Sequence, residues 1–107
     1  MPTDSARPAH VVVTGEHARV TLHGELDVMH RDALSCVLDE ARRAAKRVCV
    51  DLADVQFLDW IALSLILQMA SLHRRAGGTV VVTGATTSTR RLVGLMGAEA
   101  LLGTSLN

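Results

Sequence analysis

The stretch that decides the fold is residues 48–59, VCVDLADVQFLD, together with the segment that follows it, residues 60–75, WIALSLILQMASLHRR. The first five residues form an apolar run broken only by Asp51, which is typical of a strand buried on both faces of a sheet. In the second segment apolar residues surround a narrow polar stripe, and Gly77-Gly78 follows as a stop. The pattern predicts a helix capped at Asp59, and a buried strand leading into a helix predicts parallel pairing through a helical crossover.

Two strands and a helix are expected before this stretch. Val11 to Val13 and Ala18 to Leu22 are β-branched or alternating apolar runs separated by Gly15-Glu16, which predicts a hairpin. Asp27 is placed to cap the helix that follows. Apolar residues then recur at the spacing of one helix face, at Leu34, Val37, Leu38, Ala41 and Ala45.

One more strand and one more helix are expected after it. Thr79 to Thr83 predicts a strand, and Ser88 is placed to cap a helix that ends at Gly97. The order of elements predicts an α/β fold, a mixed four-stranded sheet with helices packed mainly on one face. A chain of 107 residues suits one domain. We expect a flexible leader at residues 1–9, the domain at residues 10–107, and room for one more turn within residues 98–107.

Composition excludes several classes of function. The formal net charge is zero, the arginines come in scattered pairs, and there is one Phe and one Trp, so no basic stripe with stacking aromatics is present to bind nucleic acid. The five His are spread singly, so neither a metal site nor a cofactor is expected. Cys36 and Cys49 are expected to be small buried residues in a reducing compartment. Without an apolar signal segment, and with Ser64, Gln68 and Ser71 interrupting the longest apolar stretch, we expect a cytoplasmic protein that does not insert into membranes.

Two motifs flank the expected helices. Gly24-Glu25-Leu26-Asp27 precedes the first, and Val50-Asp51-Leu52 through Val55 to Asp59 precedes the second. In order and separation they resemble the signature of the STAS (sulfate transporter and anti-sigma factor antagonist) family. The resemblance covers nearly the whole chain, including Gly77-Gly78 and the stretch from Arg90 to Gly97. It implies a bacterial protein of transcription regulation that acts by protein-protein interaction.

The resemblance also implies a binding site at the start of the second helix. In antagonists of this family that helix begins with an aspartate, two small hydroxyl residues, a glycine and a leucine, and the partner kinase phosphorylates the second hydroxyl residue, a serine. Here the stretch reads Asp59-Trp60-Ile61-Ala62-Leu63, with Ile61 in place of the serine. The implied function is an anti-sigma factor antagonist that binds an anti-sigma factor of the histidine-kinase-like ATPase type without phosphorylation at the usual site. The implied contacts are Asp27, Asp59, Trp60, Ile61, Ala62 and Ser64.

Simpler structural explanations exist for these residues, and an alternative function is open to the protein. Asp27 and Asp59 are expected helix caps in any case, and Trp60 could fold back into the core. Ser64 is the weaker candidate for a displaced phosphate acceptor, because it lies one turn into the helix, where a solvated polar stripe is the ordinary account. The alternative function is a non-switching STAS scaffold or a ligand-sensing or transporter-associated module, and a stable homodimer through Trp60 would favour the scaffold. No nucleophile or histidine accompanies the two aspartates, so no enzyme activity is expected.

Overall fold

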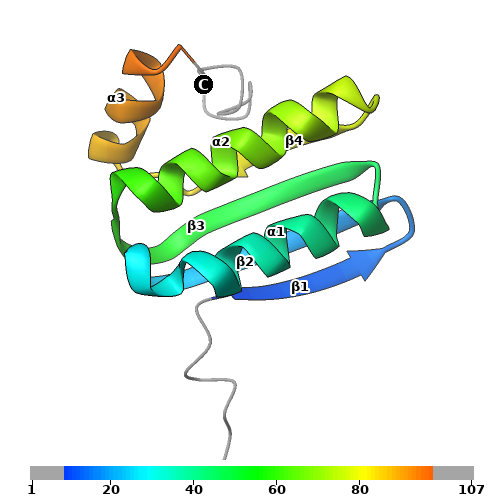
Figure 1. The fold of residues 1–107 in the computed structure, drawn as a ribbon, viewed down its shortest axis with the longest axis horizontal. Helices are drawn as coiled ribbons and strands as arrows, with labels where there is room; N and C mark the ends of the chain where they lie inside the picture. The colour runs from blue at the N-terminus through cyan, green and yellow to red at the C-terminus, as the bar shows by residue number, and fades with distance from the viewer. Residues whose placement is uncertain (1–8, 98–107) are drawn as a thin grey trace, which may run out of the picture.

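The computed structural model describes residues 9–97 and contains four strands, three α-helices and one short 3-10 helix (Figure 1). Their order is β1 (Ala9–Thr14), β2 (His17–Leu26), η2 (Val28–His30), α1 (Arg31–Ala44), β3 (Arg47–Leu58), α2 (Trp60–Arg75), β4 (Thr79–Thr83) and α3 (Thr87–Leu95).

The four strands form one sheet in the order β1-β2-β3-β4. Strand β1 pairs with β2 in antiparallel register across the Gly15 turn, where a φ of 60° suits glycine. Strands β2, β3 and β4 are parallel, each joined to the next through a helix. The predicted α/β class, with a mixed four-stranded sheet, is confirmed.

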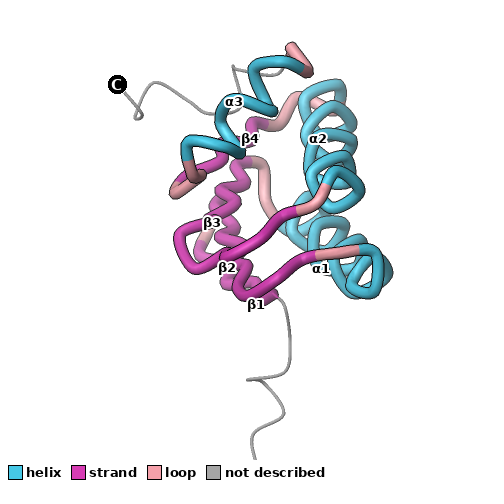
Figure 2. Tube along the Cα trace, turned by 90° about the vertical axis from the view of Figure 1, so that its left-hand side faces the viewer, coloured by secondary structure: helices cyan, strands magenta, loops and turns pink. Residues whose placement is uncertain are grey.

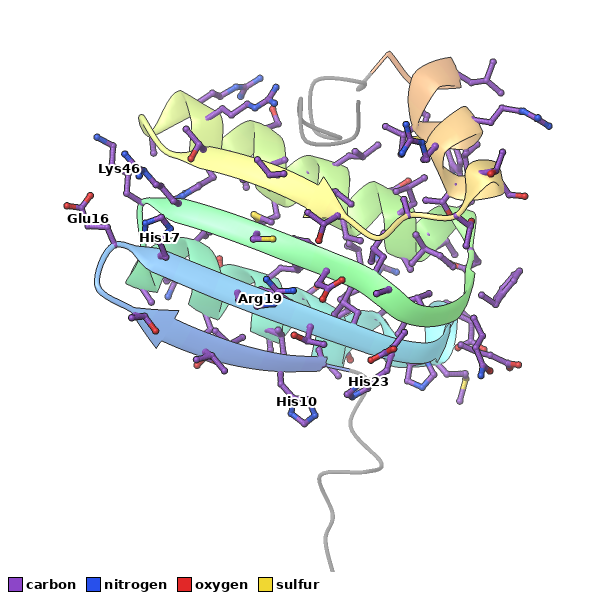
Figure 3. All side chains as sticks on the ribbon, turned by 180° about the vertical axis from the view of Figure 1, so that it is seen from behind. His10, Glu16, His17, Arg19, His23 and Lys46 are labelled. Carbon is purple, nitrogen blue, oxygen red and sulfur yellow. The ribbon has the colours of Figure 1, made fainter. Side chains whose placement is uncertain are left out.

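Helices α1 and α2 pack side by side on one face of the sheet, while α3 lies at the β4 edge (Figure 2). The core fills the space between this face and the helices, and α3 contributes Val93 to it. Its largest fully buried side chains are Leu22, Leu26, Leu34, Leu63, Ile66, Val20, Val50 and Val93. Within residues 9–97 no helix covers the opposite face of the sheet. Figure 3 shows this open face.

Strand β3 departs from the prediction for residues 48–52. Val48, Val50 and Leu52 are buried, whereas Cys49 and Asp51 on the alternate face are partly exposed. The expectation of burial on both faces is wrong because α1 and α2 cover only one face, so the strand alternates like those of a one-sided sheet. The expectation that both cysteines are buried fails with it, since Cys36 is exposed on α1 and Cys49 half-buried.

Two helix starts also differ from the sequence analysis. Asp27 caps the short helix η2, and α1 begins only at Arg31. Thr86 rather than Ser88 caps α3, because its hydroxyl accepts from Thr89 N at 3.2 Å.

Ala9, placed in the expected leader, is a buried residue of β1. The predictions for residues 1–8 and 98–107 lie outside the described residues.

Candidate protein-binding surface

The two sequence motifs meet at the carboxyl end of β2 and β3. In the parallel register Glu25 lies beside Phe57 and Leu26 beside Leu58. Asp59 N donates to Leu26 O at 3.0 Å, so the residue before α2 is bonded to the last residue of β2. Two helices begin at this junction, η2 after β2 and α2 after β3, and they lie against each other.

Both aspartates of the junction act as caps. Asp59 Oδ1 accepts from Ala62 N at 2.8 Å and begins α2. Asp27 Oδ1 accepts from Met29 N at 2.9 Å, and His30 Nδ1 lies 3.3 Å from the same oxygen. An N-cap contributes about 1 kcal/mol to stability. The predicted caps are confirmed, with η2 in place of α1 for Asp27.

The residues around these caps leave an apolar surface uncovered. Trp60 is 58% exposed, so the reading in which it folds back into the core is wrong. Ile61 beside it and Phe57 at the end of β3 are also exposed, and η2 contributes Met29 at 84% and Val28. We call these five residues, Val28, Met29, Phe57, Trp60 and Ile61, the junction patch. Exposed apolar residues gathered at one end of a protein are typical of sites of interaction with other proteins.

The structure separates the other residues implied by the resemblance. Ala62 is 1% exposed, so its side chain belongs to the core and cannot contact a partner, although its backbone N–H donates to the capping carboxylate of Asp59. Ser64 is partly buried within α2. Val28, Met29 and Phe57 were not predicted as site residues. Phe57 stands three positions from Trp60 in the sequence, whereas only the fold brings η2 beside α2.

The open face of the sheet carries a separate polar pair. Arg19 Nη2 lies 2.7 Å from Asp51 Oδ2, between neighbouring strands β2 and β3. The backbone N–H of Ala53, which donates to Asp51 Oδ1 at 3.0 Å, lowers the pKa of this carboxyl, and the bond from Arg19 lowers it further against the opposing effect of burial. Asp51 is therefore held ionised as a bonded part of the sheet.

Charge is distributed unequally between the two ends of the strands. The carboxyl end, which carries the junction patch, holds Glu25, Asp27, Asp32, Asp54 and Asp59 against Arg31, Arg90 and Arg91. The opposite end, where α1 and α2 finish, holds Arg42, Arg43, Lys46, Arg47, Arg74 and Arg75 against Glu16, Asp39 and Glu40. The chain as a whole is neutral, but within residues 9–97 the patch-bearing end carries more acidic than basic side chains and the other end more basic than acidic ones.

The described residues contain neither a candidate metal site nor a candidate membrane span. Within residues 9–97 no group of three or more His, Cys, Asp or Glu side chains could hold a metal ion. No helix among the same residues is long and apolar enough to cross a membrane.

Several solved structures are similar to this chain. One is the anti-sigma factor antagonist SpoIIAA in its unphosphorylated form, at 18% identity over 81% of this chain and 82% of that one, with a TM-score of 0.72. The phosphorylated form of SpoIIAA, a Bacillus cell fate determinant, gives 18% identity over 84% of each chain and a TM-score of 0.72. An anti-sigma factor antagonist from Mycobacterium paratuberculosis gives 22% identity over 89% of this chain and 81% of that one, with a TM-score of 0.73.

At these identities the likeness shows the fold. No curated protein matches the sequence significantly. A family model described as "Mlab, STAS domain" matches residues 9–103, which include both motifs, all four strands and the junction patch. A sheet of the SpoIIAA type and a family match over most of the sequence lead to one conclusion: this chain is a member of the STAS domain family.

Proposed function

We propose that this protein is a non-catalytic regulator of the anti-sigma factor antagonist type. Its partner is an anti-sigma factor of the histidine-kinase-like ATPase type, bound through the junction patch. The observation that carries the proposal is the exposure of Trp60 and Ile61 at the capped start of α2. The similarity to SpoIIAA and to the mycobacterial antagonist supports this choice of partner class.

The patch has the composition of a binding hot spot. Tryptophan is among the residues most enriched at such sites, and burying an exposed aromatic side chain contributes about 2 to 3 kcal/mol. Because Asp59 and the bond to Leu26 fix the start of α2, Trp60 is held on a rigid element. A side chain that is already positioned loses less entropy on binding.

The proposed interaction does not depend on phosphate. Neither the indole of Trp60 nor the aliphatic side chain of Ile61 can accept a phosphoryl group. Ser64 remains a candidate acceptor, but it lies partly buried one turn into α2, further from the exposed helix start. We therefore propose that binding persists under conditions in which a serine at position 61 would be modified and the complex released.

The test uses the purified protein as bait in a lysate of the source organism, and the bound proteins are identified by mass spectrometry. Trp60→Asp combined with Ile61→Asp places two carboxylates in the patch and is expected to reduce capture of a kinase-like anti-sigma factor at least about tenfold. Leu72→Asp is the matched control, since Leu72 is 50% exposed at the other end of the same helix. Circular dichroism checks that each variant is folded.

A second arm adds ATP to the captured complex. The wild-type protein is expected to keep its mass, whereas Ile61→Ser is expected to gain a phosphoryl group and lose affinity. Ser64→Ala tests the displaced acceptor: modification of the wild type that this variant abolishes would contradict the phosphate-independent interface.

Other outcomes would replace the proposal. A stable homodimer that Trp60→Asp dissociates, without a kinase-like partner, would favour the scaffold or transporter-associated module. Turnover of a substrate that is lost in Asp27→Asn with Asp59→Asn would contradict the non-catalytic role.

A further inference from the structure

The open face of the sheet is hollowed at the end opposite to the junction patch. The hollow has a volume of about 500 Å³, within the range of small-molecule sites, roughly 300 to 1,000 Å³. It lies on the face that α1 and α2 leave uncovered, where Figure 3 shows His17 and Arg19 on β2. It is therefore separate from the proposed protein-binding surface.

The hollow follows from two rows of cross-strand neighbours. The outer row is Thr14, His17, Arg47 and Thr79, and the inner row is Val12, Arg19, Cys49 and Val81. All eight residues line the hollow, and each of the four strands contributes one residue to each row. Neighbouring strands are about 4.8 Å apart, so a row across four strands spans about 14 Å.

The chemistry of the lining is amphipathic and basic. Val12, Cys49 and Val81 give an apolar floor across the sheet. None of the described residues that line the hollow is acidic, whereas two of them, Arg19 and Arg47, carry guanidinium groups. Asp51 outside the hollow pairs with Arg19, whereas Arg47 has no ion-pair partner among the described residues. The uncompensated positive charge is thus at Arg47, on the outer row.

The surroundings strengthen this charge. Arg47 belongs to the basic end of the molecule, where Lys46 precedes it. Of the four arginines in the last turns of α1 and α2, Arg42 and Arg43 pair with Asp39, whereas Arg74 and Arg75 have no ion-pair partner among the described residues. Glu16 lies at the same end beside Lys46 and offsets part of that field (Figure 3). Cations outnumber carboxylates here, and a low-dielectric floor increases the attraction of an anion to them.

From this geometry we propose that the hollow binds a small amphipathic anion, with its carboxylate or other acidic head at Arg47 and its apolar body over Val12, Cys49 and Val81. A guanidinium donates paired hydrogen bonds to a carboxylate, and Thr14 and Thr79 offer hydroxyls on the same row. The span of the inner row suits an alkyl chain of medium length. The site makes the proposed regulator a binder of a metabolite-sized ligand as well as of a protein.

The two cysteines provide the test. Cys49 lies in the floor of the hollow, whereas Cys36 is exposed on α1, on the other side of the sheet. The reduced protein is treated with N-ethylmaleimide, and the alkylation rate of each thiol is followed by peptide mass spectrometry. Decanoate, below its micelle concentration, is expected to slow alkylation of Cys49 by at least about threefold and to leave Cys36 unchanged.

Matched probes and variants separate the parts of the site. Decanol has the chain without the charge, and inorganic phosphate the charge without the chain, so each is expected to protect Cys49 less than decanoate does. Arg47→Gln is expected to reduce the protection by decanoate, whereas Arg90→Gln, an exposed arginine on α3 at the other end of the molecule, is expected to retain it.

Three results would overturn the proposal. Equal protection by decanol, or full protection in Arg47→Gln, would show that no anion site exists. Equal slowing of Cys36 would show non-specific association. Protection of Cys49 that rises with protein concentration and without added ligand would show that a second copy of the chain covers the face.

Discussion

At the scale of single residues, Asp51 is a charged side chain on the open face of the otherwise largely apolar start of β3. Its pKa is below the ordinary value of 3.8, chiefly because the backbone N–H of Ala53 donates to it, and Arg19 adds a bond from the next strand. A carboxyl whose pKa is lower in the folded state binds protons more readily when unfolded. Its contribution to stability is therefore complete above pH 3.8 and is lost as the pH falls through the folded pKa.

We predict that Asp51→Asn lowers the free energy of unfolding by about 1 kcal/mol near neutral pH, because the amide cannot pair with Arg19 as a charge. The deficit should shrink as the pH falls below 3.8. Urea unfolding followed by circular dichroism at several pH values measures it. Asp54→Asn is the matched control on the same strand, exposed and without a hydrogen bond among the described side chains. A deficit that stayed constant with pH would contradict the role assigned to the carboxylate.

At the scale of elements, one contact fastens the end of α2 to the starts of β3 and β4. His73 is 5% exposed, and its Nε2 lies 2.7 Å from Lys46 O in the turn before β3. Gly78 packs against the imidazole so closely that a Cβ at this position would collide with the ring. Gly78 N bonds to His73 O at 2.8 Å, and Thr79 N to Lys46 O at 2.9 Å. Gly78 is thus required by the lack of space, whereas Gly77 before it takes the left-handed conformation of the turn, with a φ of 91°.

We predict that Gly78→Ala destabilises the protein by about 1 to 3 kcal/mol, because the added methyl group must displace a packed ring. The same change in a His73→Ala background should cost less, since the ring is gone, and the difference is the coupling energy of a double-mutant cycle. Thermal unfolding of the four proteins measures it. Additive effects of the two substitutions would mean that the collision is not the cause.

The sequence was most informative about where helices and strands lie along the chain, and least informative about how they pack against one another. The periodicity of residues 60–75 and the cap at Asp59 predicted α2 with its observed bounds, because a cap and a glycine stop are local signals. The full length of β3 and the one-sided burial of Cys49 and Asp51 depend on which face the helices cover. The position of η2 beside α2 likewise depends on packing between distant segments, so Met29 could not be assigned to the site.

At the scale of the whole molecule, the neutral total charge hides an acidic end and a basic end. We predict that the protein is retained at low salt by both anion and cation exchangers near pH 7, because each resin meets the end of opposite charge. Arg74→Gln with Arg75→Gln should elute from the cation exchanger at lower salt than Arg90→Gln with Arg91→Gln. Both variants lose two charges, but the first pair comes from the basic end and the second lies on α3, at the acidic end (Figure 1). Identical elution would contradict a separation of charge.

The exposure of Trp60 has a consequence for spectroscopy. The chain has one tryptophan and no tyrosine, so its near-ultraviolet emission arises almost entirely from one side chain in the junction patch. That indole is already largely in water when the protein is folded, so unfolding changes its surroundings little, whereas burial against a partner changes them strongly. Emission from this protein therefore reports on docking at one end of the molecule and is nearly blind to the state of the core.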